Sequence, residues 1–221
     1  MQGMTGGQIL VECLKRQGTD HAFCVPGESY LAVLDALHDQ RDSIALTVCR
    51  QEGGAANMAE AHGKLTGRPG ICFVTRGPGA TNASTGVHTA FQDSTPMILF
   101  IGQVGRDMRH REGFQEVNFE AMFAPLAKWS AEISDPRRIP EYIHRAFQTA
   151  LAGRPGPVVL SLPEDMLTEV VEGDIEFGVR AEAIPAAPRA SDIKALVDLV
   201  EKAERPLVIA GGGGWSTEAG E

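Results

Sequence analysis

One glutamate and one glycine-rich turn have the residue types and spacing to support chemistry. Glu52 precedes small residues at helical spacing, which leave one helix face almost flat: Ala55, Ala56, Ala59 and Gly63. The next apolar run ends in the turn Thr75-Arg76-Gly77-Pro78-Gly79-Ala80-Thr81-Asn82. We expect a buried acid beside a tight turn rich in backbone groups, an arrangement that suits binding of a flat heterocycle and proton transfer on it.

The residues alone leave simpler interpretations open. Glu52 is also the type of acid that a helix dipole favours in a first turn, an effect worth ~0.3–1 kcal/mol. The turn from Thr75 to Asn82 is also compatible with anion binding at a helix N-terminus. It lacks the G-x-x-x-x-G-K-[ST] spacing of a phosphate-binding loop.

Composition limits the class of protein. The chain has 221 residues, 43% hydrophobic residues and a net charge of -9, which is typical of a globular protein with one domain and part of another. The negative charge argues against nucleic acid as a partner, and the arginines between Arg106 and Arg111 favour a solvated loop over a phosphate-binding patch. No apolar run reaches the ~18 residues of a membrane span, and no secretory signal pattern is present. The default prediction is a cytoplasmic protein without a membrane segment.

The four cysteines, Cys13, Cys24, Cys49 and Cys72, form no C-x-x-C pair. Three of them fall in segments that resemble buried strands or a buried helix face. They favour small core residues in a reducing compartment over metal ligands or disulfides.

Apolar runs alternate with segments of helical period. Thr5 can cap a first helix that stops at Gly18. Further helices are expected from Leu31, at 52–65, 80–91, 138–151 and 191–203. Strands are expected at 21–25, 44–48, 70–75, 96–101, 127–133, 157–162 and 206–210. Continuous apolar strands that alternate with helices predict an α/β fold, doubly wound, with a mainly parallel sheet and helices on both faces.

The chain divides into three parts. Residues 1–163 form the main domain, and residues 164–190, which are acidic and then rich in Ala and Pro, read as a linker. Residues 191–221 are predicted to be the truncated start of a second, central α/β domain, so that the sequence is expected to be a fragment. The run Gly211 to Gly214 lacks the spacing of a dinucleotide-binding loop.

These motifs resemble the pyrimidine-binding domain of thiamine-diphosphate enzymes, and most closely that of the acetolactate synthase large subunit. The resemblance runs from about Thr5 to Pro163 and implies a flavodoxin-like thiamine-diphosphate-binding fold. It implies that Glu52 is catalytic, because the corresponding acid bonds the aminopyrimidine ring and promotes removal of the C2 proton of the thiazolium. The residues that it implies around the cofactor are Pro26, Gly27, Glu52, Thr75, Pro78, Asn82 and Gln115.

The resemblance also assigns a substrate side. It implies that Glu28, Phe114, Gln115 and Glu164 face the substrate, and that Arg154 contacts FAD if that cofactor is retained. The sequence has no Gly-Asp-Gly motif of the kind with which the family binds Mg²⁺ and diphosphate, so the Mg²⁺ ligands are expected in a missing C-terminal domain.

Three positions depart from the family pattern. Gln51 stands where a histidine is usual, Glu28 replaces the second glycine of a Pro-Gly-Gly turn, and Glu164 replaces a lysine. Two additional carboxylates make a second anionic 2-oxo acid a less natural acceptor. The alternative to a place beside the substrate is that Glu28 caps a helix and that Glu164 lies in a solvated linker.

The implied function is decarboxylation or cleavage of a 2-oxo acid and transfer of the carbanion to an acceptor. The implied assembly is a homo-oligomer of at least two subunits, because family members pair the pyrimidine domain of one subunit with the diphosphate domain of another. A homodimer and a homotetramer both stay open. A decarboxylase or C–C lyase that is not an acetolactate synthase is the first alternative, and a non-catalytic binding or regulatory module is the second. The fragment alone is expected to be inactive.

Overall fold

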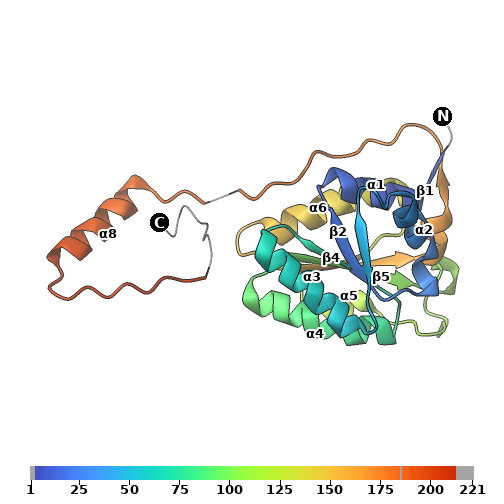
Figure 1. Cartoon of the computed structure of the whole chain (residues 1–221), viewed down its shortest axis with the longest axis horizontal. Helices are drawn as coiled ribbons and strands as arrows, with labels where there is room; N and C mark the ends of the chain where they lie inside the picture. The colour runs from blue at the N-terminus through green and yellow to red at the C-terminus, as the bar shows by residue number, and fades with distance from the viewer. Residues whose placement is uncertain (1–2, 185, 213–221) are drawn as a thin grey trace.

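A six-stranded parallel sheet with helices on both faces forms the body of the computed structural model, which describes residues 3–184 and 186–212 (Figure 1). The strand order is β3-β2-β4-β5-β7-β6, and every neighbouring pair is parallel. The strands are β2 (His21–Cys24), β3 (Ala45–Val48), β4 (Gly70–Val74), β5 (Met97–Gln103), β6 (Trp129–Glu132) and β7 (Pro157–Pro163). A separate antiparallel pair joins β1 (Met4–Thr5) to β8 (Val170–Val171). The predicted fold class is confirmed.

The helices form two layers. The α-helices are α1 (Gly6–Arg16), α2 (Leu31–Asp39), α3 (Glu52–Thr66), α4 (Pro78–Asp93), α5 (Phe119–Phe123), α6 (Ile139–Leu151), α7 (Glu164–Thr168) and α8 (Ala190–Lys202). Three short 3₁₀ helices are η1 (Glu28–Tyr30), η2 (Arg106–Met108) and η3 (Pro136–Arg138). One buried cluster contains α1, α2, α6 and α7, and the other contains α3, α4 and α5. Successive residues of β4 and β5 contribute to opposite clusters, as the alternation of side chains along a strand requires.

Local sequence signals explain where the first and third helices begin. Thr5 Oγ1 accepts the N–H of Gln8, and Gln8 Oε1 accepts the N–H of Thr5, which is a reciprocal capping box for α1. Gln51, the position where the family has a histidine, caps α3 by accepting the N–H of Gly54 at 2.8 Å. Both side chains satisfy backbone groups that a helix start leaves unpaired.

Small residues let α3 and α4 approach each other closely. Ala55, Ala56 and Ala59 are fully buried in α3, and Ala83 is fully buried in α4. At Gly86 of α4, an added Cβ would lie only 2.5 Å from the Cβ of Ala56, so this contact requires glycine. The flat face predicted for the Glu52 helix is thus shared: Ala56 meets Gly86 of α4, whereas Ala59 lies against Gly70 of β4.

Three of the four cysteines are core residues, as predicted. Cys13, Cys24 and Cys72 are buried, Cys49 is half-buried, and all four are free. Burial raises the pKa of Cys13 to about 12 and that of Cys24 to about 11, so neither thiol ionises readily.

Part of the predicted linker, the segment that follows β7, packs on the domain. α7 and β8 lie within residues 164–171, and Phe177 lies under the guanidinium of Arg16 at 4.4 Å. Gln17 then holds the chain by accepting the N–H of Ala181 and donating to the carbonyl of Val179. The division of the chain at residues 163 and 190 stays a prediction.

The predicted strand at 206–210 is wrong. These residues form neither helix nor strand, and Leu207, Val208 and Ile209 are exposed. A lone apolar strand has no partner for its backbone groups, so it does not form. The predicted helix at 191–203 corresponds to α8, which lies apart from the sheet and has no buried residue (Figure 1). Gly213 and Gly214 lie outside the described residues. Within the described parts of the chain, no helix has the length and apolarity needed to span a membrane.

Candidate active site

The predicted site residues gather where the parallel strands end. β2, β4, β5 and β7 run in the same direction, so the turns that follow them meet at one edge of the sheet. Ligands of open α/β sheets bind at this carboxyl edge. Gly27 packs so closely on Thr75 that a Cβ there would lie 2.5 Å from the Thr75 Cβ. The hydroxyls of Ser29 and Thr75 are hydrogen-bonded at 2.8 Å, which joins the turns after β2 and β4.

Glu52 and Asn82 face each other across the starts of two helices. Glu52 is the first residue of α3, and its Oε2 accepts a hydrogen bond from Asn82 Nδ2 of α4 at 3.0 Å. Its Oε1 would lie 3.7 Å from a Cβ at Gly79, beside the glycine turn, and accepts no hydrogen bond from the described residues. The amide of Asn82 therefore fixes the carboxyl group and leaves one oxygen available.

The expectation that Glu52 is buried is wrong for this chain. Its side chain is half-buried, and Asn82 and Pro78 beside it are exposed. The physical reason is that all three lie at an open edge of the sheet, where no other segment of the described chain covers them. We call Gly27, Glu52, Thr75 and Asn82 the glutamate side of the site.

The turns around Glu52 are held in fixed conformations. Gly77 has a φ of +59°, and a Cβ there would lie 2.7 Å from the Cβ of Gln115, so the turn requires glycine and brings Gln115 onto it. Pro78 is the first residue of α4, where its missing N–H costs nothing. The exposed Pro26 follows Val25, whose carbonyl accepts the Tyr30 hydroxyl at 2.5 Å.

Sequence reasoning missed one residue, Arg76. Its buried side chain donates from Nε to the carbonyl of Phe114 at 2.9 Å. Its Nη1 lies 3.3 Å from Glu164 Oε2, and its Nη2 lies 3.4 Å from Glu28 Oε1. The signal that could have found it was a cation in the turn after β4 while two unexpected acids followed two other strands of the same sheet, β2 and β7.

The two additional carboxylates share a cationic partner, and their expected effect on the acceptor stays a prediction. Glu28 and Glu164 are not isolated charges, because both pair with Arg76, and the three groups together carry one net negative charge. Glu28 is the first residue of η1 but makes no capping hydrogen bond there. Both acids line a cavity of about 320 Å³ together with Ser29, Gly105 and Asp165.

Further arginines anchor residues 104–118, which we call the arginine loop. Arg106 pairs with Asp165 at 2.7 Å and with Glu169 at 2.6 Å. Arg109 pairs with Glu116 at 3.0 Å and with Glu132 at 3.4 Å. The expected solvated loop is thus a structured one, because its arginines bind carboxylates of the same domain.

The pKa values of the carboxylates in this network are shifted in opposite directions. The backbone N–H of His110 holds the pKa of Glu116 below its usual value, with further help from Gly113 and Arg109. Burial raises the pKa of Glu132 above its usual value, despite the neighbouring Arg109. Burial acts to raise the pKa of Asp165 too, but hydrogen bonds from Arg106 outweigh it and lower that pKa. Charge in the arginine loop therefore depends on specific hydrogen bonds.

Two predicted substrate and cofactor contacts have different surroundings. The side chain of Phe114 is exposed, although its carbonyl is held by Arg76. Arg154 precedes β7 and so lies at the opposite edge of the sheet from Glu52. It donates to Ser94 Oγ at 2.7 Å and to the carbonyls of Phe91 and Gln92 at the end of α4. The structure does not bring Arg154 together with the glutamate side.

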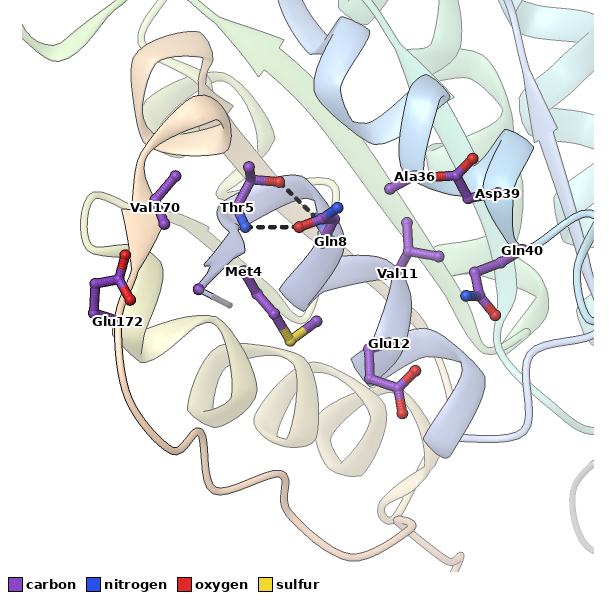
Figure 2. A pocket seen from close by; sticks show the side chains of 11 residues that line it. Met4, Thr5, Gln8, Val11, Glu12, Ala36, Asp39, Gln40, Val170 and Glu172 are labelled. Atoms are coloured by element: carbon purple, nitrogen blue, oxygen red, sulfur yellow. Dashed lines mark hydrogen bonds between the residues drawn. The ribbon is translucent and has the colours of Figure 1, made fainter. Parts of the chain in front are cut away.

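A separate cavity of about 680 Å³ lies between α1, α2 and the β1–β8 pair (Figure 2). Its wall carries the carboxylates Glu12, Asp39 and Glu172, and none of the predicted site residues. Across residues 3–184 and 186–212, no three metal-binding side chains gather into a metal site.

Comparison with known proteins identifies the class. The family described as "Thiamine pyrophosphate enzyme, N-terminal TPP binding domain" matches residues 4–122, and the chain belongs to this family. The resemblance drawn from the motifs is confirmed.

Its relatives are acetolactate synthases. The chain is 39% identical over 216 residues to "Acetolactate synthase" of Bacillus subtilis (strain 168), which covers 97% of this chain and 37% of the relative. It is 35% identical over 220 residues to "Acetolactate synthase catalytic subunit, mitochondrial" of Saccharomyces cerevisiae, covering 96% of this chain and 32% of that protein. It is also 35% identical over 211 residues to "Acetolactate synthase large subunit" of Lactococcus lactis, covering 95% and 36%. The chain thus spans between a third and two fifths of the length of most of these curated relatives.

The residues at the carboxyl edge fit the pyrimidine half of thiamine diphosphate. An aminopyrimidine needs a carboxyl oxygen that can share a proton, and Glu52 Oε1 has no hydrogen-bond partner among the described residues. The ring also needs a flat surface with backbone atoms close to it. The turn at Gly77 and the contact of small residues between α3 and α4 supply this surface. The chain is thus an acetolactate-synthase-like N-terminal domain that binds thiamine diphosphate.

Proposed function

We propose that the complete enzyme containing this chain decarboxylates or cleaves a 2-oxo acid and transfers the resulting carbanion to an acceptor, as an acetolactate-synthase-like transferase or lyase. The single observation that carries the proposal is the Glu52–Asn82 pair beside the Gly77 turn, at the carboxyl edge of a family-typical sheet. The names of the relatives support the substrate class.

Each residue of the glutamate side has a proposed role. Glu52 shares a proton through Oε1 with the pyrimidine ring, and Asn82 keeps the carboxyl group oriented by binding Oε2. Thr75, Pro78 and Gly27 form the surface against which the ring rests. These residues would hold the pyrimidine half of thiamine diphosphate, which would supply the carbon nucleophile and the electron sink for the reaction.

The substrate side is proposed from the turns next to Thr75. Gln115 lies on the Gly77 turn and contacts both cofactor and substrate, and Pro26 contributes to the cofactor side. Glu28 and Glu164, which line the 320 Å³ cavity, face the substrate. The exposed side chain of Phe114 faces the substrate as well. The exposed faces of these residues support the proposal, because they are free to meet a ligand.

The remaining parts of the holoenzyme are proposed by family likeness. Mg²⁺ and the diphosphate bind to a part of the complete enzyme that this chain does not include, FAD contacts Arg154 if it is retained, and the protein is a homodimer or homotetramer. The open carboxyl edge at Glu52 supports a second subunit, since a proton-transfer site needs cover from water. Residues 1–163 are the pyrimidine domain, 164–190 the linker and 191–221 the start of the central domain. Buried free thiols support a cytoplasmic location.

Thiamine-dependent CO₂ release tests the function. The complete enzyme is incubated with pyruvate and a panel of other 2-oxo acids, with and without thiamine diphosphate and Mg²⁺. We expect CO₂ release from at least one acid, and only with the cofactor present. Cofactor-independent release, or none with any acid, would contradict the proposal.

A further inference from the structure

Arg76 connects four turns of the carboxyl edge. The arginine itself follows β4, and its three contacts reach Glu28 after β2, Phe114 in the arginine loop and Glu164 after β7. Its side chain is 9% exposed, whereas those of Glu28 and Glu164 are 59% and 47% exposed. A buried cation therefore stands behind two acids that reach the surface.

The geometry of these contacts requires arginine. A guanidinium is planar and presents its N–H groups in fixed directions, so Nε, Nη1 and Nη2 can each serve a different partner. A lysine at position 76 would carry the same charge on one nitrogen. It would therefore supply the charge without the fixed fork that holds three segments at once.

The contact with Phe114 fixes the part of the arginine loop that faces the site. Gln115, the next residue, has a φ of +62°, which is an unfavourable conformation for a residue with a side chain. Such a conformation persists only where the surroundings impose it. Here they are the Arg76 bond to the Phe114 carbonyl on one side and the bonds that Glu116 accepts from His110 and Gly113 on the other.

Arg76 also fixes the charge of the 320 Å³ cavity. Glu28 and Glu164 line this cavity, and Arg76 does not. A molecule in the cavity thus meets two carboxylates whose positions are set by the cation behind them. Without that cation, neither acid would have an ion-pair partner among the described residues.

We propose that Arg76 is the positioning residue of the substrate side: it holds Gln115, Glu28 and Glu164 in place for the 2-oxo acid and takes no part in proton transfer at Glu52. The inference rests on the proposed function and adds to it the residue that controls substrate affinity. Arg76 contacts neither Glu52 nor Asn82 among its recorded partners, so the two tasks are separable.

The test compares substrate affinity with cofactor activation in the complete enzyme. Arg76→Gln and Arg76→Lys are measured for KM with pyruvate and for hydrogen–deuterium exchange at C2 of bound thiamine diphosphate. We expect both variants to raise KM at least about tenfold, the equivalent of one lost charge-assisted contact. C2 exchange should stay within about threefold of the wild-type rate, because none of the three partners of Arg76 is Glu52 or Asn82.

The matched control is Arg68→Gln, which removes an arginine that pairs with Asp20 at the opposite edge of the sheet, so KM should keep its wild-type value. Glu164→Gln removes one carboxylate of the cluster but leaves Arg76 bound to Glu28 and to the Phe114 carbonyl, so KM should change less than in either Arg76 variant. Full rescue by Arg76→Lys would overturn the proposal in favour of a simple charge effect. An unchanged KM in Arg76→Gln, or an equal loss of kcat and C2 exchange, would overturn it as well.

Amide hydrogen exchange separates this inference from the proposed function. In the complete protein without substrate, Arg76→Gln should speed exchange in the peptides covering 106–117 and leave the peptides of α3 unchanged. We expect this result even if the enzyme does not turn over pyruvate. In that case the proposed substrate is wrong, and the amide exchange data alone test the role of Arg76. Unchanged protection of 106–117 would overturn the positioning role.

Discussion

The two sides of the candidate site are built by different forces. The glutamate side rests on close contacts of small residues, with α3 and α4 meeting through Ala56 and Gly86. The arginine loop rests on ion pairs and on hydrogen bonds from arginines, with Arg106 and Arg109 as its anchors. Van der Waals packing tolerates little change in volume, and ion pairs respond to pH and charge.

This difference assigns different tasks to the two sides. Proton transfer to a bound ring needs a carboxyl oxygen held within a fraction of an ångström, which rigid packing provides. Adaptation to different substrates needs a surface whose charge can change without disturbing the fold, which a loop provides. We infer that substitutions in the arginine loop change substrate preference, whereas substitutions between α3 and α4 change the activation of the cofactor.

The largest expected effect is the loss of thiamine diphosphate affinity when the glutamate side is separated from the rest of the cofactor site. The 221-residue chain alone should bind thiamine diphosphate no more tightly than about 1 mM, or about -4 kcal/mol, because it lacks the proposed diphosphate and Mg²⁺ contacts. It should also be catalytically silent. Isothermal calorimetry with and without Mg²⁺ measures the affinity, with the complete enzyme as the control. Micromolar, Mg²⁺-dependent binding by residues 1–221 would refute this prediction.

A matched pair of glycine substitutions tests the packing of the glutamate side. Gly86→Ala places a Cβ against Ala56 and should lower the free energy of unfolding by about 1–3 kcal/mol, the usual cost of overpacking. Gly54→Ala makes the same chemical change in α3 where only Gln51 Oε1 lies nearby, at 3.9 Å, and should be neutral or slightly stabilising. Urea unfolding of both variants measures the difference. Equal stabilities would mean that α3 and α4 do not depend on this close contact.

The smallest effect concerns pH and the arginine loop. The pKa of Glu116 is lowered in the folded protein, so its contribution to stability is present above the unfolded carboxyl pKa and is lost as pH falls through the lower folded value. Glu132, with its raised pKa, acts in the opposite direction. Exchange in residues 109–116, corrected for intrinsic rates, should therefore accelerate as the pH falls below about 4.3. Glu116→Gln should remove most of this dependence, and an unchanged pH profile in that variant would assign it to another group.

Much of the fold could be predicted because its signals are local. Met97 to Gln103 is a fully buried strand within a continuous apolar run, and Thr5 with Gln8 forms the cap that the sequence suggests. Glu52 is the first residue of α3 and Asn82 lies near the start of α4, and both helices follow strands of the same sheet; the resemblance placed the two residues around one ligand. The chemical role of this pair came only from the resemblance to a known family.

The features that the sequence did not reveal, or that we predicted wrongly from it, depend on segments far apart in the chain. The pairing of Arg76 with Glu28 and Glu164 joins turns far apart in the sequence, so no local pattern reveals it. The exposure of Glu52 depends on what covers the edge of the sheet, not on its neighbours in the sequence. The apolar run at 206–210 has strand-forming residues but no neighbouring strand to pair with.

The central claim is that Glu52 carries the proton chemistry, and deuterium exchange at C2 of bound thiamine diphosphate in the complete enzyme tests it most directly. Glu52→Gln should slow this exchange by about 10²–10⁴-fold while the protein stays folded, because the change is isosteric and removes only the acid. Glu60→Gln is the control, since it makes the same change in α3 at a buried acid that binds Thr95. Exchange at the wild-type rate in Glu52→Gln, or an equal loss in Glu60→Gln, would contradict the account.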